Sequence, residues 1–199
     1  MTIENILSIY DMATPEEIRE GVVWYATALA ECRRISIDND VPLNTVVGVT
    51  AALSPNNKWT RNIVNASDMI EAYVTGESIE SFKVSTYTKM KEKAWSILEC
   101  GTVSDQEIIE ILKGQKIISF FENIMGYDGC TIDGHARNIS YNERIGLTGS
   151  LYIGKKEYKT LQEEYVEAAG MRSTNGRKLK AFEMQAVTWV AWRRIHNIT

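Results

Sequence analysis

Residues 111–137 read ILKGQKIISFFENIMGYDGCTIDGHAR, and this stretch decides the fold that the chain is expected to adopt. Apolar periodicity predicts a helix from Ile117 to Ile124, and the glycines in residues 126–129 mark a turn after it. The turn would bring the chain back, so that the amine of Lys116 and the carboxylate of Asp133 could face one cleft. Such a pair can carry out covalent chemistry on a sugar carbon.

The remainder of the chain carries the start and stop signals of helices. Capping boxes are expected at Thr14 and Ser104, each followed three residues later by a glutamate. Strand alternation is weak except at residues 151–153, so the predicted class is all-α, a compact helical bundle. We expect a single unit over residues 1–199, or two lobes sharing a cleft. The predicted helices span residues 15–35, 43–53, 58–74, 86–99, 106–112, 117–124, 134–145, 155–169 and 179–195.

The first of these helices carries the stripe of side chains expected to be buried. Its apolar residues recur at helical spacing, which predicts one face against the core. The expected stripe is Ile18, Val22, Tyr25, Ala26 and Leu29.

Composition excludes several classes of protein. The chain is 44% apolar, has no run of 18 apolar residues, and begins without the basic and apolar regions of a signal peptide. We therefore expect an intracellular, cytoplasmic protein with no membrane association. Cys32, Cys100 and Cys130 are widely spaced, which favours reduced thiols over a Cys-x-x-Cys metal site. No metal or cofactor is expected, and the oligomeric state is left open.

Charge is unevenly distributed along the chain. The formal net charge of -4 argues against a general nucleic-acid coat. Acidic residues dominate up to Glu31, whereas basic residues dominate from Gly170 onward. This asymmetry predicts either a polarised surface that guides DNA onto one face or ordinary solvated helix charges.

The segment quoted above resembles the catalytic core of the helix-hairpin-helix DNA glycosylases. In that family a hairpin ending in Gly-x-Lys is followed by a helix, a loop and Val-Asp-x-His. Here Gly114-Gln115-Lys116 and Ile132-Asp133-Gly134-His135 occupy those places. The hairpin departs from the family pattern, because Leu112 stands where its first glycine is expected. A leucine does not readily adopt the positive φ that glycine tolerates, so the hairpin is expected to be either remodelled or less able to bring its amides close to a phosphate.

The resemblance implies a role for each residue of this core. Asp133 would be the catalytic carboxylate that stabilises an oxocarbenium-like sugar, or else a plain helix N-cap. Lys116 would be a nucleophile that forms a Schiff base, giving lyase activity, or else an exposed lysine. Gly114 and Gln115 would contact DNA through the hairpin, and His135 and Arg137 would contact its phosphates. The alternative for His135 is hydrogen bonding to a backbone carbonyl.

A second polar patch occupies residues 54–62. Asn56, Asn57, Lys58 and Trp59 follow an apolar helix, and in glycosylases of this family the loop at this place often faces DNA. The amides would read base edges, and Trp59 would stack on an extruded base. The structural alternative is a Pro-Asn turn that caps the next helix, with Trp59 packed as a staple.

The sequence therefore predicts a DNA glycosylase-like protein that cleaves the N-glycosidic bond of a modified or damaged base. Together with residues 185–194, these patches also resemble a group of small bacteriophage proteins, which places the chain in the host cytoplasm. Two alternatives remain open on the same scaffold. One is a non-catalytic phage factor that binds a nucleotide or a protein, such as an inhibitor of host defence. The other is an enzyme that builds a hypermodified DNA base. A structural phage component is a third, weaker alternative.

Overall fold

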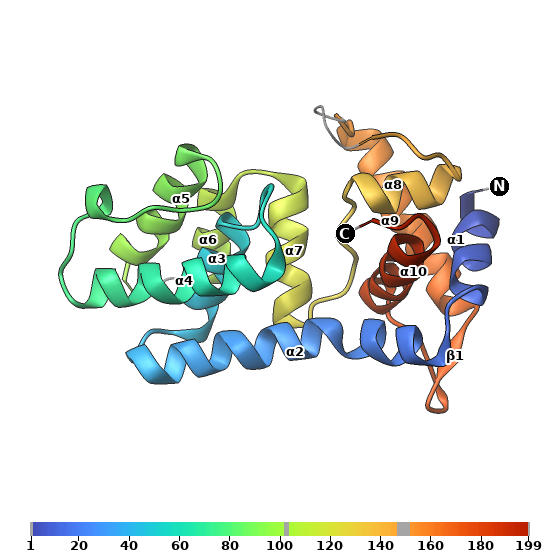
Figure 1. Ribbon diagram of the computed structural model, residues 1–199, viewed down its shortest axis with the longest axis horizontal. Helices are drawn as coiled ribbons and strands as arrows, with labels where there is room; N and C mark the ends of the chain where they lie inside the picture. Colours follow the sequence, from blue (N-terminus) through green and yellow to red (C-terminus); the bar gives the residue numbers. More distant parts are fainter. Residues whose placement is uncertain (1, 102–103, 147–151, 199) are drawn as a thin grey trace. The chain divides into compact units, whose positions relative to one another are not determined.

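The chain folds almost entirely into helices, as Figure 1 shows for a computed structural model of it. The structure describes residues 2–101, 104–146 and 152–198. Within these ranges there are ten α-helices, a short 3-10 helix and a two-stranded hairpin. The all-α class predicted from the sequence is confirmed. Contacts divide the chain into two compact units, Met1–Ala26 with Gly126–Thr199, and Thr27–Met125.

The first unit combines both ends of the chain. It contains α1 (Thr2–Asp11), the start of α2 (Pro15–Asn39), α8 (Gly134–Tyr141), α9 (Lys155–Gly170) and α10 (Ala181–Ile195). Helices α1, α8, α9 and α10 pack against one another, and the antiparallel hairpin β1 (Ser173–Thr174) and β2 (Arg177–Lys178) joins α9 to α10. The largest buried side chains of this core are Ile6, Ile132, Tyr165 and Trp192.

The second unit is built around one apolar helix. Helix α3 (Leu43–Ala52) is buried from Thr45 onward and contacts four helices of the unit. A helix that is apolar on all sides belongs in the centre of a core rather than at its surface. The surrounding elements are α4 (Trp59–Val74), η1 (Ile79–Ser81), α5 (Thr88–Glu99), α6 (Asp105–Leu112) and α7 (Gln115–Met125).

Both expected capping boxes are present. Thr14 and Glu17 exchange hydrogen bonds of 2.8 and 3.2 Å between side chain and backbone, and Ser104 and Glu107 do the same at the start of α6. These bonds satisfy backbone N–H groups that a helix start leaves without intrahelical acceptors.

Several boundaries differ from the sequence-based expectation. Helix α1 and the β1–β2 hairpin were not expected, and α2 continues to Asn39. Helix α8 ends at Tyr141, short of residue 145, because Asn142 adopts a left-handed conformation that terminates it. Of the segment with weak strand alternation, residues 152 and 153 belong to no regular element, and Leu151 lies outside the described residues.

The buried face of α2 also differs from the predicted stripe. In the first unit the buried residues are Glu17, Gly21 and Tyr25, whereas Ala26 is exposed and Ile18 and Val22 are half-buried. The reason is a close approach to α10 at Gly21. A Cβ atom built on Gly21 would lie 2.5 Å from both the Cα and the backbone nitrogen of Val187. Only a residue without a side chain allows the two backbones this proximity.

Replacing Gly21 by alanine is expected to destabilise the protein by about 1–3 kcal/mol, because the added methyl group meets backbone rather than a movable side chain. Denaturant unfolding measures the change. The matched control is Gly170→Ala in α9, where a Cβ meets nothing within 4 Å. That variant is expected to gain roughly 0.5 kcal/mol from helix propensity. Equal stability of Gly21→Ala and the parent would contradict the close approach.

Candidate functional site

Asp133 lies in the first unit, at the start of α8. It is the N-cap residue of this helix, and its Oδ1 accepts a hydrogen bond of 2.8 Å from the backbone N–H of Ala136. The side chain is half-buried. The helix start carries a partial positive charge, and the carboxylate lies next to it. Asp133 is thus a helix cap and, at the same time, an oriented anion.

One face of α9 holds the backbone on both sides of Asp133. The hydroxyl of Tyr158 accepts a bond of 3.1 Å from the N–H of Ile132, and Gln162 donates to the carbonyl of Cys130 at 2.8 Å. On the other side, Tyr165 donates to the carbonyl of Ala136 at 3.3 Å. Buried polar groups need such partners, so the bonds fix the path of the turn.

These three residues of α9 were not singled out in the sequence. Tyr158, Gln162 and Tyr165 stand at positions i, i+4 and i+7 of a helix, and therefore share one face. The sequence signal for these residues is the presence of polar groups on a helix face that is otherwise apolar. The sequence alone does not reveal which backbone they meet.

Buried phenols surround the Asp133 turn. Burial is the main cause that raises the pKa of Tyr25 and of Tyr165 well above the ordinary value, and the charge of Asp133 adds to the rise in both. Tyr25 also donates a hydrogen bond of 3.2 Å to Gln185. Both phenols therefore stay protonated and present hydroxyl groups, not charges, near the carboxylate.

His135 and Arg137 follow Asp133 on α8 but have different surroundings. The ring of His135 meets Trp189 edge to face at 6.4 Å, and the guanidinium of Arg193 lies over the same indole at 4.6 Å. Arg137 is engaged by Glu157 at 2.9 Å and by Glu143 at 3.4 Å. A phosphate contact by Arg137 would have to compete with these two carboxylates.

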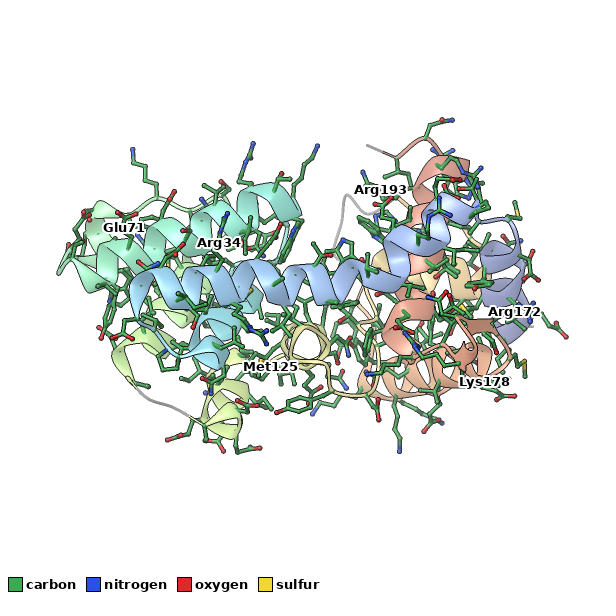
Figure 2. All side chains as sticks on the ribbon, turned by 90° about the horizontal axis from the view of Figure 1, so that it is seen from below. Arg34, Glu71, Met125, Arg172, Lys178 and Arg193 are labelled. Atoms are coloured by element: carbon green, nitrogen blue, oxygen red, sulfur yellow. The ribbon has the colours of Figure 1, made fainter. Side chains whose placement is uncertain are left out.

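Part of the charge asymmetry of the chain is neutralised by ion pairs within the first unit. Arg172 pairs with Asp11 at 2.6 Å, and Arg194 pairs with Glu17 at 2.6 Å. The acidic beginning of the chain thus neutralises part of its basic end. Figure 2 labels Arg172 and, on α10, Arg193. The pairing favours an architectural role for these charges over a surface that guides DNA.

A third ion pair belongs to the basic end alone. Arg177 binds Glu183 through two hydrogen bonds of 2.8 and 2.5 Å, and the Glu183 side chain is only 5% exposed. Bidentate pairing of this kind is stronger and more specific than a single surface contact. It ties β2 to the first turn of α10.

The residues of the expected hairpin form the turn between α6 and α7, in the second unit. Lys113 ends α6 in a left-handed conformation with φ 47°, and Gly114 leads into α7 at Gln115. Leu112 remains helical and buried. The positive φ of this turn falls on Lys113 and not on Leu112.

Lysines gather at this turn. Lys93 of α5 donates a hydrogen bond to the carbonyl of Leu112. Burial, followed by the nearby charges of Lys89 and Lys113, lowers the pKa of Lys93. Lys116 lies in the first turn of α7 and is exposed. We call Lys89, Lys93, Lys113 and Lys116 the hairpin lysines. Lys116 belongs to the second unit and Asp133 to the first.

The loop of residues 54–62 is held by its own polar groups. Asn56 is exposed with a left-handed φ of 54°, and Asn57 donates to the carbonyl of Leu53 at 3.2 Å. The indole N–H of Trp59 donates to Glu31 at 3.0 Å, and its ring meets Phe120 edge to face at 6.3 Å.

The half-burial of Trp59 accords with a packed staple, whereas Lys58 stays exposed. A base-stacking role for Trp59 would require it to leave Glu31.

In the described part of the chain, no group of three or more His, Cys, Asp or Glu residues is placed to hold a metal ion. Burial raises the pKa of the Cys32 thiol to about 11, so it is protonated at neutral pH. Among the same residues, no helix has the length and apolar character that a membrane span requires.

Comparison with known proteins places the chain in a family. Residues 1–196 match the model of a family of unknown function, DUF7178. The chain belongs to this family. No curated protein and no solved structure matches it. A function for this protein is therefore inferred from the chemistry of its own residues.

Glu17 provides a test of the internal pairing of charges. A hydrogen bond from Arg194 is the main cause that lowers the pKa of this carboxylate below its ordinary value of 4.5. Its stabilising contribution is therefore complete above about pH 4.5 and is lost as the pH falls through the lowered value.

We expect Glu17→Gln to cost roughly 1–3 kcal/mol at pH 7, because it leaves Arg194 without its carboxylate partner. The difference from the parent should shrink toward pH 3, as measured by denaturant unfolding across this range. Glu16→Gln is the control, since Glu16 is exposed and pairs only with Arg19 at the surface. A difference that stays constant with pH would contradict the assignment.

Proposed function

We propose that the protein binds DNA and hydrolyses the N-glycosidic bond of a modified or damaged base, with Asp133 as the catalytic carboxylate. The single observation that carries the proposal is the fixed position of this carboxylate. The carboxylate accepts a hydrogen bond from the backbone at the start of α8. Residues of α9 form hydrogen bonds with the backbone on both sides of Asp133.

Hydrolysis of this bond requires a fixed anion and a water molecule. As the bond between C1′ and the base nitrogen breaks, its electron pair leaves with the base and the sugar becomes oxocarbenium-like. Asp133 would stabilise that positive charge electrostatically. In the described part of the chain, Asp133 forms no ion pair with lysine or arginine, so its charge is not already neutralised. Water then adds to C1′ and gives up a proton to Asp133 or to solvent.

The hairpin lysines support binding to the phosphate backbone. Lys113 and Lys116 are exposed on either side of Gly114, at the start of α7. The first N–H groups of a helix have no intrahelical acceptors and favour an anion. A phosphate at the α6–α7 turn would therefore meet both backbone donors and ammonium groups. Such contacts position DNA without reading its sequence.

Hydrolysis by water is favoured over a Schiff base. A nucleophilic lysine needs a desolvated amine, and Lys116 is exposed. The proposal therefore gives Lys116 a phosphate-binding role. Transfer chemistry that builds a hypermodified base would use the same carboxylate on a different substrate.

The non-catalytic alternative has one observation in its favour. Arg137, which the family resemblance assigns to phosphate, is occupied by Glu157 and Glu143. On this alternative the protein would bind a nucleotide or another protein without releasing a base. Activity assays on the parent protein separate the two.

Asp133→Asn tests the catalytic role without removing the helix cap. Asparagine caps a helix about as well as aspartate but carries no charge. We expect the variant to keep its melting temperature and to lose about 100-fold or more of the rate of base release under single-turnover conditions. The substrates are duplexes carrying uracil, oxidised bases or hydroxymethylated bases.

Lys116→Ala is the matched control for that experiment. At protein concentrations that saturate the DNA for each variant, Lys116→Ala should release the base at the rate of the parent, and borohydride should trap no adduct with either protein. Trapping that depends on Lys116 would overturn hydrolysis in favour of a lyase. Absence of release by the parent from every duplex would contradict catalysis and favour the binding alternative.

Lys113→Ala and Lys116→Ala test the DNA-binding surface. Each is expected to weaken DNA binding and to reduce the dependence of log K on log salt by about 0.9, the value for one lost phosphate contact. Fluorescence anisotropy at several salt concentrations measures both quantities. Lys178→Ala, an exposed lysine of the β1–β2 hairpin, is the control. Equal slopes for all three variants would reject the α6–α7 turn as the binding surface.

A further inference from the structure

The second unit has an open hollow that neither the DNA-binding turn nor Asp133 uses. It lies where the C-terminal ends of α4 and α5 meet the segment around η1, and its volume is about 590 Å³. Its lining includes the aromatic residues Tyr73 and Trp95 and the acidic residues Glu77, Glu80 and Glu99. The hollow is large enough for one long side chain and too open to enclose a whole small molecule.

Aromatic rings form its apolar part. Tyr73 and Trp95 meet edge to face, with ring centroids 5.5 Å apart. Trp95 is buried and Tyr73 is half-buried, so both rings are fixed by packing while part of the tyrosine remains accessible. Aromatic faces attract cations, and attract the planar guanidinium group in particular.

The electrostatics of the hollow are negative. Its three glutamates are exposed. Among the residues that the structure describes, no lysine or arginine lines the hollow. The ends of α4 and α5 add the partial negative charge of helix C-termini. The ammonium of Lys91 is directed at backbone carbonyls of the segment around η1.

The segment around η1, which forms one wall of the hollow, is held in place by hydrogen bonds. The ammonium of Lys91 donates bonds of 2.7 Å to the carbonyls of Ile79 and of Phe82. Ser81 donates to Glu77 at 3.1 Å. These bonds hold the segment around η1 in place, so a ligand would not have to order it.

We propose that this hollow binds an arginine side chain presented by a partner polypeptide. The guanidinium would lie against Tyr73, with its N–H groups directed at Glu77, Glu80 and Glu99. Arginine fits better than lysine because its planar group can stack on a ring and donate to two carboxylates at once. The site would make the protein part of a complex, and it does not depend on the proposed glycosylase activity.

The test uses the full chain and the peptide acetyl-Gly-Arg-Gly-amide, followed by the ¹H–¹⁵N indole resonance of Trp95. We expect a saturable shift with a dissociation constant in roughly the millimolar range. Added salt should weaken the binding, because exposed charges are screened. The same peptide with citrulline, which keeps the shape and removes the charge, should produce no saturable shift.

A charge-removed variant, Glu77→Gln with Glu80→Gln and Glu99→Gln, should bind the arginine peptide about tenfold more weakly. The control makes the same change in net charge at exposed glutamates outside the hollow, Glu71, Glu92 and Glu110, of which Figure 2 labels Glu71. That control should bind like the parent. No saturable shift, equal binding of the citrulline peptide, or equal weakening in both triple variants would overturn the proposal.

Discussion

The close contact between α2 and α10 is the constraint on which the first unit depends. Gly21 lets the two backbones meet at Val187. On either side of that contact, Glu17 reaches Arg194 and Tyr25 reaches Gln185. An ion pair, a backbone contact and a buried phenol thus follow one another along a single seam. Moving the helices apart by the width of a methyl group would disturb all three.

This seam has a direct bearing on the candidate site. Tyr25 belongs to this seam, and the charge of Asp133 contributes to the raised pKa of the Tyr25 phenol. The carboxylate is oriented by α8, its flanking backbone by α9, and its phenolic surroundings by α2. An anion held in this way needs little reorganisation when positive charge develops nearby, which is the usual source of electrostatic catalysis.

Local signals in the sequence were enough to predict much of the fold. The capping boxes at Thr14 and Ser104, and the N-cap at Asp133, depend on residues within one turn of each other, and all three are present. Features that depend on distant partners were not predictable. Gly21 lies inside a helical pattern, and only the position of Val187 explains why glycine stands there.

The candidate site likewise has features that the sequence predicted and features that it did not. The position of Asp133 at a helix start was visible in the sequence, whereas its support from Tyr158, Gln162 and Tyr165 was not. The basic residues toward the end of the chain suggested a positively charged surface. The partners of Arg172 and Arg194 lie more than 150 residues away, so only the folded chain shows that these charges are paired.

The left-handed backbone at Lys113 restricts what evolution or design can place there. Valine, isoleucine and threonine are branched next to the backbone and fit this conformation poorly, so they would force the bend to open. Glycine and asparagine adopt it readily and would keep the bend while losing the ammonium group. Glycine or asparagine at this position would therefore change the charge of the turn without changing its shape.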